Sequence, residues 1–116
     1  MKTRVLIVDD HREFRDVLAL MIDSQNDMVV IGKAEDGENA IAMTRDRLPD
    51  VIIMDVKMPI MSGVEATRRI LAEMPGMKIL AFSIYADDEF LTNMMRAGAV
   101  GYILKGCDND ELFGAI

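Results

Sequence analysis

Residues 51–54 read Val-Ile-Ile-Met and lead directly into Asp55. This apolar run does not alternate with polar residues, which is typical of a strand buried on both faces. Four other short runs have the same character: Val5–Val8, Met28–Ile31, Ile79–Phe82 and Tyr102–Leu104. Because strands of this kind occur in parallel sheets covered by helices, the sequence predicts an α/β protein with a five-stranded parallel sheet.

The segments between these runs predict the helices that connect parallel strands. Each is long enough for a crossover helix, and apolar residues recur in them at helical spacing. These residues are Phe14, Val17, Leu18 and Met21 in the first segment, Ala40, Thr44 and Leu48 in the second, Val64, Leu71 and Met74 in the third, and Phe90, Met94 and Ala97 in the fourth. The predicted fold is a doubly wound (βα)5 domain that spans residues 1–116.

Capping signals predict where the helices begin. The capping-box spacing occurs three times, and an Asp-Gly pair precedes the second helix. These signals are Asp10 with Glu13, Ser62 with Glu65, Asp108 with Glu111, and Asp36-Gly37. The last helix has room for few apolar residues before Ile116. We therefore expect it to be cut short, and the chain to be a piece of a longer protein.

Charge and cysteine content limit the function. The 116 residues include 20 acidic and 13 basic side chains, for a net charge of −7. Such a domain would repel the phosphates of nucleic acid, so we do not expect it to bind DNA or RNA alone. The one cysteine, Cys107, cannot form an internal disulfide, which favours a reducing compartment. The apolar run Val5–Val8 is too short for a signal peptide or a membrane span, so we expect a cytoplasmic protein without membrane contact.

Polar side chains follow the predicted strands at the point where each strand ends. Asp9 and Asp10 follow the first, Asp55 the third, Ser83 the fourth and Lys105 the fifth. Taken singly, Asp10 could be a helix cap, Ser83 a turn residue and Lys105 a solvated side chain. The carboxyl ends of parallel strands meet at one edge of a sheet, however, so the sequence predicts that all five converge.

Three carboxylates at one edge would repel one another and raise one another's pKa values. A hard divalent cation relieves this repulsion, and Mg2+ suits it because it takes one or two carboxylates together with phosphate oxygens. A carboxylate beside Mg2+ can also attack a phosphoryl group, which would make Asp55 a candidate nucleophile. Lys105 would then pair with phosphate, and Ser83 would donate to it.

From Lys2 to its end, the chain resembles the receiver domains of bacterial two-component response regulators. The stretches that carry the resemblance are Val8-Asp9-Asp10, Asp36-Gly37, residues 55–63 (Asp-Val-Lys-Met-Pro-Ile-Met-Ser-Gly), Ala81-Phe82-Ser83, and Gly101-Tyr102-Ile103-Leu104-Lys105. The resemblance implies a flavodoxin-like receiver topology with strand order 2-1-3-4-5.

The resemblance also implies a role for individual residues. Asp55 would be the phosphoacceptor. Mg2+ would be held by Asp10 directly, by Asp9 through water, by Asp55, and by the backbone carbonyl of Lys57. The residues that respond to the phosphoryl group would be Ser83, Lys105 and Tyr102, the last by turning inward. Lys57 and Tyr85 would set how fast water removes the phosphoryl group.

Two shorter stretches resemble the NarL/FixJ-type transcriptional regulators. They are Val8-Asp9-Asp10-His11 followed by Phe14-Arg15, and Arg96-Ala97-Gly98-Ala99 before Gly101-Tyr102. The resemblance implies that a sensor histidine kinase phosphorylates Asp55, that phosphorylation leads to a homodimer, and that transcription is the output. DNA binding would belong to a C-terminal helix-turn-helix domain absent from this chain. Such a receiver is a phosphoacceptor and not a turnover enzyme.

Three residues near the expected site are also notable. Gly106 follows Lys105 where many receivers have proline, and Ile60 replaces a frequent glycine in the loop after Asp55. His11, beside the acidic pair, suggests a metal ligand, but we expect it to be an exposed residue in the first turn of a helix.

Other readings of the acidic cluster remain open. A phosphatase of the haloacid-dehalogenase kind needs a second aspartate two residues after the nucleophile, where this chain has Lys57. A flavodoxin-like electron carrier needs a hydroxyl- and glycine-rich phosphate loop, and the acidic residues 9–13 would repel the phosphate of FMN. A receiver that binds partners without being phosphorylated would not need to keep Asp9, Asp10, Asp55, Ser83 and Lys105.

Overall fold

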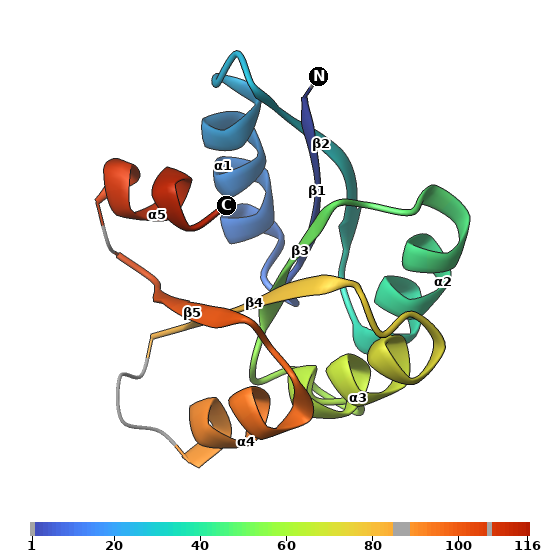
Figure 1. Cartoon of the computed structure of the whole chain (residues 1–116). Helices are drawn as coiled ribbons and strands as arrows, with labels where there is room; N and C mark the ends of the chain where they lie inside the picture. Colours follow the sequence, from blue (N-terminus) through green and yellow to red (C-terminus); the bar gives the residue numbers. More distant parts are fainter. Residues whose placement is uncertain (1, 85–88, 107) are drawn as a thin grey trace.

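The computed structural model describes residues 2–84, 89–106 and 108–116. Strands and helices alternate along the chain (Figure 1). In chain order they are β1 (Thr3–Val8), α1 (Arg12–Asp23), β2 (Met28–Ala34), α2 (Gly37–Arg47), β3 (Val51–Asp55), α3 (Gly63–Glu73), β4 (Lys78–Ser83), α4 (Glu89–Ala97), β5 (Gly101–Leu104) and α5 (Asn109–Ala115). None of the helices among these described residues is long and apolar enough to span a membrane.

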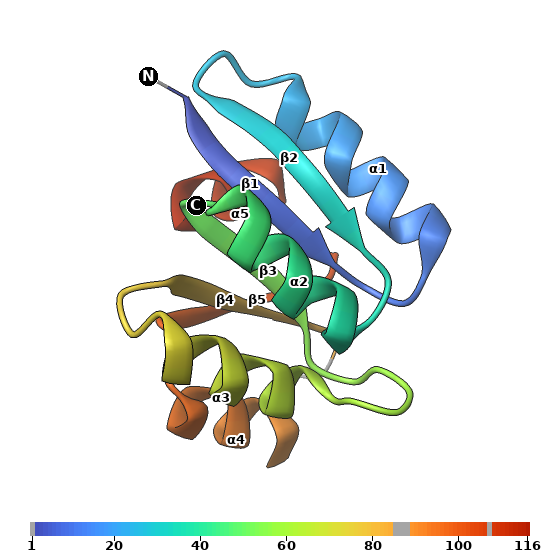
Figure 2. The same cartoon turned by 90° about the vertical axis from the view of Figure 1, so that its right-hand side faces the viewer.

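The sheet confirms the predicted fold class and strand order. Its five strands are all parallel and lie in the order β2-β1-β3-β4-β5. Helices α1 and α5 cover one face, and α2, α3 and α4 cover the other (Figures 1 and 2). This arrangement places the chain reversal of a doubly wound sheet between β1 and β3, which is the usual location of a ligand site.

Both faces of the sheet are apolar, which explains why the strands appear as continuous apolar runs. Val5 and Ile7 belong to a core cluster with residues of α1 and α5. Leu6 and Val8 belong to the opposite cluster, with residues of α2, α3 and α4. Because successive strand residues point to opposite faces, four apolar residues in a row are needed to fill both cores.

Three of the four predicted helix starts are confirmed. The side chains of Asp36, Ser62 and Asp108 each accept a hydrogen bond from the backbone N–H three residues later, at 2.8, 3.2 and 2.8 Å. The prediction for Asp10 is wrong. The residue before α1 is His11, which makes no side-chain capping bond, because the carboxylate of Asp10 is directed into the acidic cluster described below.

Two predicted helix faces also need correction. In α1, Leu18, Ala19 and Ile22 are buried, whereas Val17 is 56% exposed. Leu48 does not extend the buried side of α2. It ends that helix in the left-handed region at φ 47° and is largely exposed. The spacing of apolar residues therefore identified both helices but misplaced one member of each buried face.

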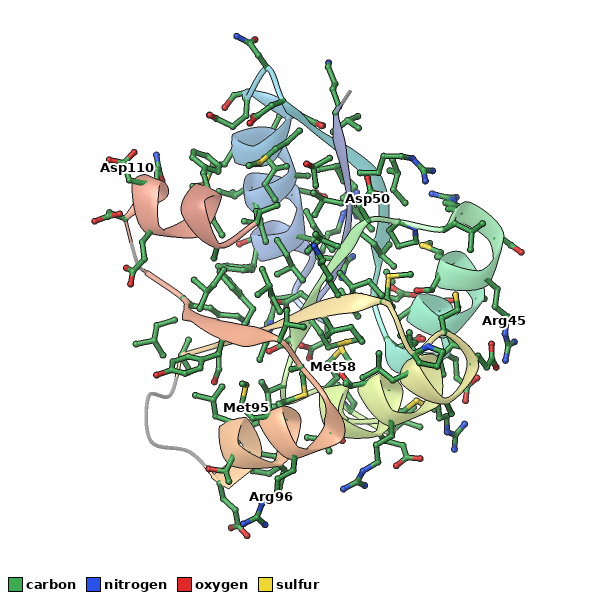
Figure 3. All side chains as sticks on the ribbon, in the orientation of Figure 1. Arg45, Asp50, Met58, Met95, Arg96 and Asp110 are labelled. Carbon is green, nitrogen blue, oxygen red and sulfur yellow. The ribbon has the colours of Figure 1, made fainter. Side chains whose placement is uncertain are left out.

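Charged side chains lie on the outer surface of the helices. Arg45 of α2 forms an ion pair with Glu73 of α3. Figure 3 shows Arg45, Arg96 and Asp110 pointing outward from α2, α4 and α5. Met58, by contrast, is buried and contributes to the core beneath α3 and α4. Much of the net charge is thus on solvated surface, apart from the cluster at the sheet edge.

Candidate functional site

The predicted site residues meet at the carboxyl edge of the sheet. Asp55 and Ser83 are the last residues of β3 and β4, and Asp9 and Lys105 directly follow β1 and β5. A pocket of about 330 Å³ opens at this edge. Its lining residues are His11, Phe14, Asp55, Lys57, Ser83, Ile84 and Lys105. The structure therefore confirms that residues from four strands, up to 96 positions apart in sequence, converge there.

Lys105 lies between two of the carboxylates. Its Nζ donates to Oδ2 of Asp9 at 2.8 Å and to Oδ1 of Asp55 at 3.4 Å. The ammonium is also 4.6 Å from the ring centre of Phe14 and 5.9 Å from that of Phe82. These rings shield the lysine, whose side chain is only 13% exposed. A shielded ammonium between two acids interacts with them more strongly than a solvated surface lysine would.

Asp9 is held by every polar part of its own residue. Its side chain is 2% exposed, and Oδ1 accepts a hydrogen bond from the backbone N–H of His11 at 2.9 Å. Its backbone carbonyl accepts from Nη1 of Arg15 at 2.6 Å, and its N–H donates to the carbonyl of Ala34 at 3.1 Å. The position of this carboxylate is therefore set by β1, β2 and α1 together.

Asp10 has a buried oxygen without a hydrogen bond. Among the residues that the structure describes, its Oδ1 is buried and accepts no hydrogen bond, although Nδ1 of His11 lies 3.2 Å away. Asp9, Asp10, His11 and Asp55 each offer a ligand atom, and these atoms lie within 4.8 Å of one another. An oxygen that lacks a partner beside other carboxylates is well placed to bind a cation. The donor set therefore fits the predicted divalent cation.

The pKa of Asp55 is raised from 3.8 to about 7. Burial is the largest cause, because it penalises the charged carboxylate, and the negative charge of Asp9 is the next. Lys105 opposes the shift, while the neighbouring carboxyl of Asp10 adds to it. A bound dication would lower this pKa and keep Asp55 in the anionic form that a nucleophile requires.

The turn between β3 and α3 brings the backbone very close to Asp55. A Cβ at Gly63 would lie 2.1 Å from the carbonyl oxygen of Asp55. The N–H of Gly63 donates to the carbonyl of Val56 at 2.9 Å, and Ser62 caps the helix that follows. A residue with a side chain at position 63 would therefore displace the backbone that carries the candidate nucleophile. Sequence reasoning noted Gly63 in a motif but did not identify this contact.

The loop after Asp55 contains two further features. Ile60, predicted as a replacement for glycine, has a φ of 69° and is fully exposed. This left-handed conformation is strained for a β-branched residue and explains why glycine would suit the position. Lys57 places its ammonium 4.6 Å from the ring centre of Phe90 in the first turn of α4. This cation–π contact joins the loop to a helix 33 residues away, and no local pattern indicates it.

The remaining predicted residues have these positions. Ser83 is 6% exposed and lines the pocket, as does Lys57. Tyr102 of β5 is 53% exposed. Tyr85 and Cys107 lie outside the described residues. Phe14 was predicted only as part of a helix face, yet it also covers Lys105, and its phase near the start of α1 was the available signal.

Comparisons with known proteins agree with this arrangement. The family model for the response regulator receiver domain matches residues 5–116. The transcriptional regulatory protein DegU of Brevibacillus brevis is 39% identical over 115 residues, which cover 99% of this chain and 49% of DegU. The chain spans about half the length of the curated relatives that it matches.

Solved structures show the same fold. A LuxR-family two-component response regulator from Aurantimonas sp. SI85-9A1 has a TM-score of 0.93 and 32% identity, covering 99% of this chain and 82% of that one. The signal receiver domain of the putative response regulator NarL from Mycobacterium tuberculosis has a TM-score of 0.91 and 28% identity, covering 98% of this chain and 92% of that one.

Proposed function

The chain belongs to the response regulator receiver domain family, and from this premise we propose that Asp55 accepts a phosphoryl group from a sensor histidine kinase. Its similarity to DegU and to the NarL receiver places it with the NarL/FixJ-type regulators. The observation that carries the proposal is the position of Asp55. It ends a central strand beneath a pocket, within 3.4 Å of the Lys105 ammonium and beside two further aspartates.

In the proposed reaction, a carboxylate oxygen of Asp55 attacks phosphorus and the P–N bond to the donor histidine breaks. The imidazole leaves with the bonding electrons and takes up a proton. The residues that would hold Mg2+ are Asp9, Asp10, Asp55 and the backbone carbonyl of Lys57. When bound, this cation would offset the repulsion between an anionic acceptor and an anionic donor.

The new phosphoryl group would add roughly −1.5 to −2 units of charge and three acceptor oxygens at Asp55. Lys105 already lies within reach, and we expect its ammonium to move from Asp9 toward the phosphoryl oxygens. The Ser83 hydroxyl, buried at the end of β4, would donate to the same group. Tyr102 has a largely exposed side chain and would turn inward behind Ser83. The result is a two-state surface around α4, β5 and α5.

The output of this switch would be control of transcription. The relative DegU is named a transcriptional regulatory protein. We propose that phosphorylation produces a homodimer and that DNA is bound by a helix-turn-helix domain beyond these 116 residues. The receiver itself would act in the cytoplasm as a phosphoacceptor that loses its phosphoryl group slowly. Lys57, in the pocket, and Tyr85 would set that rate.

A turnover phosphatase is the main alternative function. That chemistry needs a second acid two residues after the nucleophile, and the residue there is Lys57, whose ammonium faces the ring of Phe90. A cation at this position supports retention of a phosphoryl group more than its transfer to water by acid catalysis. The phosphoacceptor function is therefore the better fit to the site.

Labelling with acetyl phosphate and Mg2+ tests the proposal. Intact-mass spectrometry should detect one phosphoryl adduct in the wild type and none in Asp55→Asn. Asp46→Asn changes an exposed aspartate of α2 and should be labelled like the wild type. Phosphorylation of Asp55→Asn at the wild-type level would rule out Asp55 as the acceptor.

The dimer is tested separately. Beryllofluoride with Mg2+ mimics an aspartyl phosphate, and sizing should then show a change from monomer to dimer. A wild-type protein that binds beryllofluoride but remains monomeric would remove dimerisation from the proposal and leave the phosphoacceptor role intact.

A further inference from the structure

We propose that His11 makes this a site for a transition-metal dication, such as Co2+ or Zn2+, with the imidazole Nδ1 as a ligand beside Asp9 and Asp10. The inference rests on the cation site of the proposed function and adds a ligand to it. Sequence reasoning expected His11 to be an exposed residue in the first helical turn. The structure shows that it is exposed, but it precedes α1 and its ring faces the acidic pair.

The geometry of the three side chains suits a common metal ion. Nδ1 of His11 lies 3.2 Å from Oδ1 of Asp9 and 3.2 Å from Oδ1 of Asp10. An octahedral ion with ligands at about 2.1 Å has neighbouring ligand atoms about 3 Å apart. The nitrogen is thus at ligand spacing from an oxygen of each aspartate. Asp55 completes a group whose ligand atoms all lie within 4.8 Å.

One of these oxygens has no other partner. Oδ1 of Asp10 is buried and accepts no hydrogen bond in the described part of the chain. Coordination by a cation would satisfy this atom, and the imidazole nitrogen nearest to it would then face the same ion. The unpartnered oxygen and the imidazole therefore point to the same ligand.

The backbone around His11 holds the ring in this position without using it for the fold. The N–H of His11 donates to Asp9 Oδ1 at 2.9 Å, so the residue is fixed to the acidic pair through its main chain. Its side chain is 70% exposed and makes no helix-capping bond. The imidazole can therefore exchange its contact with Asp9 for a metal without loss of core packing.

Ligand chemistry predicts which ions should benefit. Mg2+ prefers oxygen ligands, whereas imidazole nitrogen suits cobalt, nickel, copper and zinc. Removing the imidazole should therefore weaken binding of Co2+ much more than binding of Mg2+. A purely structural role, in which Nδ1 only orients Asp9 through a hydrogen bond at 3.2 Å, would affect both ions equally.

Calorimetric titrations with Co2+ and with Mg2+ distinguish these roles. The protein should carry no affinity tag, and Cys107→Ser should be the common background because a thiol would compete for Co2+. We expect His11→Phe to lower Co2+ affinity by about tenfold or more, at least the loss seen when a metal ligand loses its supporting partner. Its Mg2+ affinity should stay within about twofold, because the oxygen ligands are unchanged.

Two further variants act as controls. Asp10→Asn should weaken both ions, because it removes a charged ligand common to them. Asp46→Asn, on the surface of α2, should change neither. Equal losses for Co2+ and Mg2+ in His11→Phe, or an unchanged Co2+ affinity, would overturn the inference while Mg2+ binding upheld the cation site. If neither ion binds the wild type, the cation site of the proposed function fails as well.

Nitrogen NMR gives a second readout. The chain has one histidine, so the imidazole signals of a tag-free sample need no further assignment. Saturation with diamagnetic Zn2+ should shift the Nδ1 resonance to a metal-bound value, and Mg2+ should not. An Nδ1 resonance that does not respond to bound Zn2+ would contradict coordination by His11.

Discussion

At the scale of single residues, Asp55 shows how one environment gives both reactivity and cost. Burial and the charge of Asp9 raise its pKa to about 7, although it is the carboxylate that would attack phosphorus. The folded protein without a cation therefore binds a proton at Asp55 that the unfolded chain has already released. A group of this kind stabilises the fold at low pH, and the contribution is lost as the pH rises through 7.

This difference predicts a pH effect on stability. Between pH 6 and pH 8.5 in a chelating buffer, the free energy of unfolding of the wild type should fall by about 1 kcal/mol relative to Asp55→Asn. That value allows for solvent screening at the open pocket, since the full shift would correspond to more. Urea unfolding of both proteins at the two pH values measures it.

Asp46→Asn should follow the wild type in the same experiment, because this exposed aspartate is remote from the acidic cluster. Parallel pH profiles for the wild type and Asp55→Asn would show that the pKa of Asp55 is not raised. Excess Mg2+ should reduce the difference between the two proteins, because a cation stabilises the charged carboxylate of the wild type.

At the scale of elements, the turn from β3 to α3 fixes the candidate nucleophile. The contact of Gly63 with the backbone of Asp55 leaves no room for a methyl group. Gly63→Ala should therefore lower the free energy of unfolding by at least about 2 kcal/mol, because neither backbone segment can yield without moving its strand or helix. Chemical denaturation is the direct measurement.

The matched control is Gly114→Ala in α5. Gly114 is also helical, but a Cβ there would meet nothing within 4 Å. The control should be neutral or should stabilise the protein by up to about 1 kcal/mol, in line with the helix propensity of alanine. A Gly63→Ala protein as stable as this control would mean that the turn can relax more than the structure indicates.

At the scale of the whole molecule, the sheet separates two cores. Ile22 of α1 belongs to one cluster and Ile70 of α3 to the other, and both side chains are fully buried. Ile22→Val and Ile70→Val should each cost about 0.5–1.5 kcal/mol. In the double variant the two costs should add within about 0.5 kcal/mol, because the sites share no packing partner across the sheet. A larger deviation in urea unfolding would show that the cores are coupled.

Much of the architecture could be predicted from the sequence because its physical cause is local. Apolar runs marked all five strands, since filling two cores leaves no place for alternation. The run at 28–31 underestimated β2, which continues to Ala34. As an edge strand, β2 pairs only with β1, and residues such as Lys33 are tolerated there. The strand order required the family resemblance, because no single strand specifies its neighbours.

The site was predictable in outline and not in detail. Strand ends necessarily bring Asp9, Asp55, Ser83 and Lys105 to one edge. The spacing of Asp10 and Glu13 resembled a capping box, but the acidic cluster determined the direction of the Asp10 side chain. Contacts between distant segments, such as that of Lys57 with Phe90, depend on packing that residue spacing does not report.

The bond between Lys105 and Asp9 has a consequence for the connectivity of the sheet. It links the ends of β5 and β1, which are separated in the sheet by β3 and β4. A phosphoryl group on Asp55 would compete with Asp9 for this one ammonium. Its arrival would thus exchange a long-range tie between the second and last strands in the sheet order for a shorter tie between β5 and β3. We expect that the signal reaches β5 as a change of bonding partner.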